Sequence, residues 1–150
     1  MTTPNIEIRP METIDLKNVV ELGMATEELQ IETNKPMYYS VENIKKLIGS
    51  GSGVCLTATV DGVFAGFFIA TYHDYFNEGY LSDISVKTEY RKLGIGKKLF
   101  NTGMEELKKL GMEWSWGLVH EDNENMQKIM ERQGFKKGRK FIFYYKDNDK

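Results

Sequence analysis

The stretch GVCLTATVDGVFAGFFIATY, residues 53–72, decides the fold class. In its first run, apolar residues alternate at Val54, Leu56, Ala58 and Val60, and a second apolar run resumes after Asp61-Gly62. Asp-Gly between two such runs is typical of the tight turn of a β-hairpin. The stretch therefore predicts two antiparallel strands, which argues against a doubly wound sheet in which strands and helices alternate regularly.

Working outward from this hairpin, the periodicity of apolar residues predicts an alternation of strands and helices. A strand over 5–11 and two helices, from Thr13 to about Leu29 and from Ser40 to Gly49, precede it. Helix starts are indicated by Thr and Ser caps and the second helix end by glycine. The remaining predicted elements are a strand over 80–86, a helix over 96–111, a strand over 112–119, a helix from Asp122 or Asn123 to Gly134, and a closing strand over 141–146.

The composition favours one intracellular domain. The chain has 150 residues and a formal net charge of -2, so it lacks the basic excess that nucleic-acid binding requires. It has one cysteine, no secretory leader and no apolar run long enough to span a membrane. No linker or repeat divides the sequence, so we expect residues 1–150 to form a single cytoplasmic domain with neither nucleic acid nor membrane as a partner.

Two glycines at the predicted junction of strand and helix form a candidate anion site. They lie in EYRKLGIGKKLF, residues 89–100, which follows the strand over 80–86. The first amides of a helix lack internal partners, and Gly94 and Gly96 let the backbone turn several amides toward a phosphate. Three other interpretations are a plain tight turn, a dinucleotide fingerprint and a Walker loop, but the fingerprint lacks its third glycine and the Walker loop its Ser or Thr.

These residues resemble a known family. Arg91 to Gly96 is similar to the [RQ]-x-x-G-x-[GA] pyrophosphate loop of the GNAT N-acetyltransferase superfamily, and NENMQKIMERQGF, residues 123–135, resembles a second motif of that family. The resemblance implies an α+β fold with a mixed, mostly antiparallel sheet of six to seven strands flanked by four helices. It also implies acetyl-coenzyme A as cosubstrate, held by Ile84, Ser85 and Val86 at the pantetheine, by Arg91, Lys92, Leu93, Gly94, Ile95, Gly96 and Lys97 at the pyrophosphate, and by Asn123.

The resemblance implies an amine as acceptor, and four residues are candidates for catalysis. Asp83 is expected beside the reaction centre, where it anchors an ammonium group or orders a water that accepts a proton. His120, just past the predicted strand over 112–119, is a second candidate base, since histidine is a common general base. The family's tyrosine, which protonates the leaving thiolate, aligns with Met130, so Tyr144 or Tyr145 is a candidate substitute, although strand packing explains these two as well.

Several alternatives stay open at this point. Tyr38 and Tyr39, in the connection between the first two helices, either surround a cation or pack against the sheet. Cys55 is either an acetyl-accepting nucleophile or a small core residue, and the sequence offers no metal-ligand spacing. The predicted strand FIFYYK, residues 141–146, would form an exposed edge if unpaired, which favours a homodimer.

The leading hypothesis is an N-acetyltransferase that moves an acetyl group directly to a primary amine, on a small molecule such as a polyamine or on a protein. One alternative is a non-catalytic module that binds acetyl-coenzyme A as a sensor or docking signal. Another assigns the anion loop to a different phosphate-bearing nucleotide.

Overall fold

A computed structural model describes residues 2–32 and 34–149 and divides the chain into two compact units, 1–118 and 119–150. The first unit contains a five-stranded sheet with the strand order β1-β2-β3-β4-β5. Strands β1 to β4 pair antiparallel, and β5 lies parallel to β4. The strands are β1 (Ile6–Pro10), β2 (Gly53–Val60), β3 (Val63–His73), β4 (Glu78–Val86) and β5 (Trp114–Gly117).

The central hairpin is confirmed. Strands β2 and β3 join at Asp61-Gly62, both of which have positive φ angles, of 50° and 82°. Such angles are what a tight turn between right-twisted strands requires, and glycine adopts them without a steric penalty. The mixed α+β class predicted from this stretch is correct.

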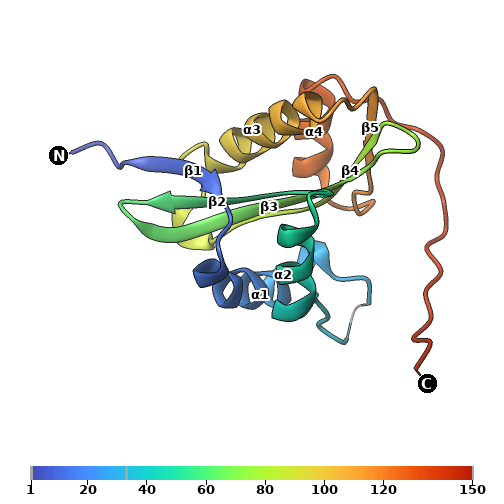
Figure 1. The fold of residues 1–150 in the computed structure, drawn as a ribbon, viewed down its shortest axis with the longest axis horizontal. Helices are drawn as coiled ribbons and strands as arrows, with labels where there is room; N and C mark the ends of the chain where they lie inside the picture. The colour runs from blue at the N-terminus through green and yellow to red at the C-terminus, as the bar shows by residue number, and fades with distance from the viewer. Residues whose placement is uncertain (1, 33, 150) are drawn as a thin grey trace. The chain divides into compact units, whose positions relative to one another are not determined.

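Helices cover both faces of the sheet. Figure 1 shows α1 (Leu16–Ala25) and α2 (Val41–Ser50) on one face and α3 (Ile95–Lys109) on the other. Phe67 of β3 is buried with α1 and α2, whereas Phe68 is buried with α3, as expected for neighbours on a strand. Helix α4 (Glu124–Arg132) belongs to the second unit, and three single-turn 3-10 helices cover Thr13–Asp15, Glu27–Leu29 and Thr88–Tyr90.

The predicted start of α2 at Ser40 is confirmed by its cap, whereas the helix ends at Ser50, just beyond the predicted end at Gly49. The Ser40 hydroxyl accepts a hydrogen bond from the Asn43 amide at 3.1 Å, which satisfies one of the free amides of the first turn. At the other end, Gly51 adopts a left-handed φ of 72° and stops the helix. These caps fix where α2 lies over the sheet.

Strand β4 contains a bulge. Ile69 of β3 pairs with Asp83, but the next residue, Ala70, pairs with Leu81, so Ser82 is an extra residue on β4. A bulge places two residues of one strand opposite one of the other and re-aims the side chains there. This explains the imperfect period of the 80–86 segment. It also brings the Ser82 hydroxyl within 3.1 Å of the Asp83 carboxylate.

The predicted closing strand over 141–146 is wrong, and with it the expectation of six to seven strands. The described part of this segment has no regular secondary structure. Its apolar side chains are largely exposed, with Phe141 at 81% and Tyr144 at 85%. Aromatic residues favour a strand only when a neighbouring strand supplies the hydrogen bonds and the packing, and among the described residues none pairs with this segment. The homodimer stays a prediction.

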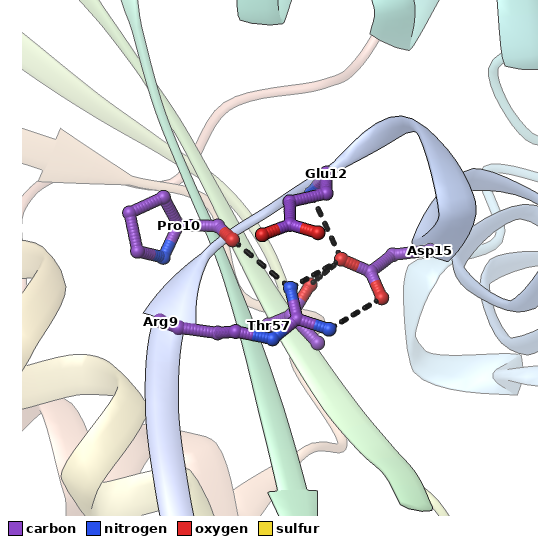
Figure 2. A network of polar contacts seen from close by, with 5 residues as sticks. All are labelled: Arg9, Pro10, Glu12, Asp15 and Thr57. Atoms are coloured by element: carbon purple, nitrogen blue, oxygen red, sulfur yellow. Dashed lines mark hydrogen bonds and ion pairs between the residues drawn. The ribbon is translucent and has the colours of Figure 1, made fainter. Parts of the chain in front are cut away.

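A buried carboxylate connects β1, α1 and β2. Figure 2 shows Asp15 facing Arg9, which donates to its two carboxylate oxygens at 2.7 and 2.8 Å. The Glu12 amide and the Thr57 hydroxyl donate to the same group at 2.8 and 3.0 Å. Burial by itself would raise the pKa of Asp15, but these hydrogen bonds outweigh it and hold the pKa below its ordinary value.

Replacing Asp15 with alanine is expected to lower the free energy of unfolding by about 3 kcal/mol, because it leaves Thr57 and the Glu12 amide without their acceptor. The native pKa of Asp15 is depressed, so its contribution is present above the unfolded pKa of about 3.9 and is lost as the pH falls through the native value. Urea unfolding at pH 7 and at pH 3 measures this: the gap between wild type and variant should shrink at the lower pH. The exposed Asp122, replaced by alanine, is the matched control.

Candidate active site

Strands β4 and β5 part near the middle of β4. Their ladder runs from Glu78–Trp114 to Leu81–Gly117 and ends there. From Asp83 to Val86, β4 pairs with β3, and no described residue continues the ladder on the other side. Among the predicted pantetheine positions, the backbone groups of Ile84 and Val86 therefore face an open strand edge, to which an extended molecule can hydrogen bond, whereas those of Ser85 face β3.

Side chains hold this open edge in place. The Ser85 hydroxyl is buried and lies 2.7 Å from the hydroxyl of Thr26, which follows α1. Arg91 donates from Nε to the Val86 carbonyl at 3.1 Å, which attaches the following loop to the strand end. The Ser85 side chain is thus used within the protein and its backbone groups face β3, so Ile84 and Val86 supply the backbone groups of the open edge.

The loop after β4 presents a row of amides. Lys92 and Gly94 have left-handed φ angles of 70° and 80°, and α3 begins at Ile95. Among the described residues, none accepts a hydrogen bond from the amides of 92–97; the first that is satisfied is Lys98, which donates to the Gly94 carbonyl at 3.1 Å. Alternating backbone conformations of this kind turn successive amides toward one point, where an anion can be bound.

The space in front of these amides is open. A Cβ atom at Gly94 would meet nothing within 4 Å, and one at Gly96 would meet only a Val86 methyl group at 3.9 Å. The helix dipole of α3 adds positive potential at the same place. The amides of this loop are therefore suited to bind a diphosphate, and the exposed side chains of Arg91, Lys92 and Lys97 lie around them.

Asp83 lies in the bulge on the face of the sheet that carries α1 and α2. Its Oδ2 atom accepts hydrogen bonds from the Tyr38 hydroxyl at 3.0 Å and from the Ser82 hydroxyl at 3.1 Å. Burial raises the pKa of Asp83, and these two bonds counteract only part of the rise. Both partners are neutral, and no described cation forms an ion pair with this carboxylate.

Tyr38, whose position the sequence left undecided, lies against the sheet and reaches Asp83. Its ring packs edge-on against Phe67, with centroids 6.0 Å apart, and lies so close to Gly23 that a Cβ there would overlap it. Gln30 holds the connection between α1 and α2 in place. Its side-chain amide donates to the Gly23 carbonyl at 3.0 Å, and its side-chain oxygen accepts from the Met37 amide. Burial, followed by the charge of Asp83, raises the pKa of Tyr38, so it remains a protonated donor.

A cavity of about 330 Å³ lies beside this group. It is lined by Tyr39, by Asn43 and Leu47 of α2, and by Thr71 and Ser82 of the sheet. Since Ser82 also donates to Asp83, the cavity and the carboxylate are neighbours. The volume is at the small end of the range for ligand pockets, about 300 to 1,000 Å³.

The other predicted site residues belong to the second unit. His120 is exposed, and Tyr144 is exposed by 85%. Asn123 caps α4, its side-chain oxygen accepting from the Met126 amide at 3.1 Å. The proposed roles of these three residues stay predictions.

Cys55 has the properties of a core residue. Burial raises the pKa of its thiol to about 11, so it is a neutral thiol near pH 7. It packs against the apolar cluster around Phe67. Both observations favour the structural interpretation over an acetyl-accepting nucleophile.

The fold and the loop define the class of protein. The model of the acetyltransferase (GNAT) family matches residues 19–135, and the chain therefore belongs to this family. As predicted, it is an N-acetyltransferase by class, with acetyl-coenzyme A as its cosubstrate. The loop of free amides after β4 fits the diphosphate of that cosubstrate.

Individual relatives are distant. An N-alpha-acetyltransferase of Sulfurisphaera tokodaii is 24% identical over 153 residues, which cover 95% of this chain and 87% of that protein. The ribosomal-protein-S18-alanine N-acetyltransferase of Escherichia coli has a TM-score of 0.76 at 23% identity, covering 97% of this chain and 86% of that one. The PaiA N-acetyltransferase of Thermoplasma acidophilum, in complex with coenzyme A, has a TM-score of 0.76 at 25% identity, covering 88% and 90%.

Two negative findings concern only residues 2–32 and 34–149. No helix there is long and apolar enough to cross a membrane. No group of three or more His, Cys, Asp or Glu side chains is positioned to hold a metal ion.

Proposed function

We propose that this protein transfers an acetyl group from acetyl-coenzyme A directly to a primary amine that binds beside Asp83. The observation that carries the proposal is the row of free amides at 92–97, next to the open edge of β4 that ends at Val86. A diphosphate on these amides and an extended arm along that edge would direct a thioester toward the β4 bulge, where Asp83 lies. We also propose that residues 1–150 act as one domain, since the family match at 19–135 includes parts of both units.

The chain's own residues have separate tasks in this proposal. Amides 92–97 bind and orient the cofactor, which supplies an acetyl group on a thiol leaving group. Asp83 attracts the ammonium form of the acceptor through its charge and, with its raised pKa, is a better proton acceptor than an ordinary carboxylate. Ser82 and Tyr38 hold the carboxylate in one orientation.

Two measurements test the proposal. Isothermal titration should give saturable binding of coenzyme A that ATP and NAD do not displace at equal concentration. A thiol-release assay with a panel of primary amines should give turnover that depends on the amine. If coenzyme A binds but none of the amines is acetylated, the sensor alternative is favoured. If ATP or NAD displaces coenzyme A, the nucleotide alternative is favoured.

Replacing Tyr38 with phenylalanine is expected to move the acidic limb of kcat/KM to higher pH. The Tyr38 hydroxyl lowers the pKa of Asp83, so its loss lets burial raise that pKa further. Since the ionised carboxylate is the active form, activity should then be lost at a higher pH than in the wild type. A pH profile of thiol release measures this. Tyr75, which is 95% exposed, gives the matched control as Tyr75→Phe, and an unshifted limb in Tyr38→Phe would contradict the positioning role.

A further inference from the structure

The sheet face beneath α2 carries an aromatic row next to Asp83. Across three strands, Thr71 pairs with Tyr80 and Tyr80 with Trp116, and side chains paired in this way lie on the same face. The neighbouring row on this face is Ile69 and Asp83, with Ser82 between the rows in the bulge. The rings of Tyr80 and Trp116 lie 4.4 Å apart, so they form one continuous aromatic surface.

Electrostatic coupling connects this row to the carboxylate. Burial raises the pKa of the Tyr80 hydroxyl, and the neighbouring Tyr39 and Asp83 raise it further. Tyr39 also lines the cavity and contacts Tyr38, with ring centroids 5.2 Å apart. Tyr39, Tyr80 and Asp83 therefore share one region, in which aromatic faces and a carboxylate all favour a cation.

Asp83 is the carboxylate that is hydrogen bonded to a residue of the cavity wall. Of the described residues that line the cavity, none is charged, and its surface is mainly apolar, with Ile44, Leu47 and Ile69 contributing. The next carboxylate on this face of β4, Glu78, is hydrogen bonded to Nδ1 of His73 at 3.1 Å. Unlike Glu78, Asp83 thus has only neutral hydrogen-bond partners among the described residues.

We propose that the acceptor is a primary amine with one positive charge on a neutral, largely apolar body, and that the cavity excludes polycations by offering one carboxylate. This inference rests on the proposed function and specifies its substrate class. The ammonium group pairs with Asp83 and the faces of Tyr39 and Tyr80. The body occupies the apolar cavity, where every further positive charge would be desolvated without a partner.

A competition among amines tests this inference. Thiol release is measured with tyramine, with a short peptide whose free N-terminal residue is alanine, with spermidine and with kanamycin. We expect kcat/KM for tyramine or the peptide to exceed that for both polycations by at least about tenfold, the discrimination that one unpaired buried charge gives. The ratio between tyramine and the peptide then distinguishes a small molecule from a protein end as the source of the amine.

An isosteric variant gives a sharper test. Asn43→Asp adds one negative charge to the cavity wall without changing its volume, and aspartate is tolerated in the first turn of α2. The preference for tyramine over spermidine should fall by about fivefold, the value of one favourable ion pair of about 1 kcal/mol. Asn5→Asp adds the same charge before β1, at the opposite edge of the sheet, and should leave the preference unchanged.

Binding to the free protein provides a readout that does not need turnover. Trp116 lies in the aromatic row, so tyramine should change the tryptophan fluorescence of the wild type, and the change should saturate. In Trp116→Phe the saturable signal should disappear. Turnover with spermidine or kanamycin equal to or above that with tyramine and the peptide overturns the inference but leaves the proposed function intact, whereas no turnover with any of the four amines contradicts the proposed function itself.

Discussion

Replacing Gly96 with tryptophan is expected to weaken the binding of coenzyme A at least about 100-fold while the protein stays folded. Two charge-assisted hydrogen bonds to a diphosphate contribute together about 3 to 6 kcal/mol, and about 1.4 kcal/mol corresponds to a factor of ten. Gly96 is the second residue of α3, and a Cβ there would contact only a Val86 methyl group at 3.9 Å, so the indole can occupy the volume in front of amides 92–97.

Gly96 is a better test position than Gly94. Gly94 has a φ of 80°, so any side chain there would strain the backbone and confuse lost folding with lost binding. Gly49, in the last turn of α2, also has open space around it and provides the control Gly49→Trp. The measurements are the dissociation constant by isothermal titration and the melting temperature. Unchanged affinity in a folded Gly96→Trp protein would refute the binding site.

The anion loop could be predicted from sequence because its signal is local. The amides of 92–97 owe their freedom to a helix that starts at Ile95 and to a left-handed glycine one residue earlier. Both features follow from neighbouring residues, as does the hairpin turn at Asp61-Gly62. A short motif therefore specifies the backbone geometry of this loop without any tertiary contact.

The acceptor side depends on distant contacts and was predicted only in part. The sequence makes Asp83 a candidate, and the broken period of β4 left room for a bulge, but nothing near Tyr38 in the sequence indicates that its hydroxyl reaches residue 83. The contact between Tyr38 and Asp83 depends on α1, because the Tyr38 ring lies close against Gly23 of that helix. It also depends on Gln30, which holds the connection in place. The failure at 141–146 has the same origin, because aromatic residues do not specify a strand without knowledge of a partner strand.

Asp83→Asn is expected to lower kcat/KM about 10²- to 10⁴-fold, the usual range for losing a group that takes part in proton transfer. An acceptor amine with a pKa of about 10.4 is almost wholly protonated at neutral pH, so it needs both a counter-charge and an acceptor for its proton. The amide supplies neither, although it keeps the size of the side chain and leaves Tyr38 an oxygen to donate to. The wild-type pH profile should fall as the pH drops through the raised pKa of Asp83, and the variant should lack this limb.

Stability separates this result from simple unfolding. Removing a partly buried charge that has no cationic partner relieves a desolvation cost, so the melting temperature of Asp83→Asn should equal or exceed that of the wild type. Asp74→Asn, in the exposed turn between β3 and β4, is the matched control and should keep full activity. Binding of coenzyme A should also be unchanged in Asp83→Asn, because amides 92–97 are intact. An active Asp83→Asn enzyme that retains the acidic limb would assign proton transfer to another group, with His120 as the first candidate.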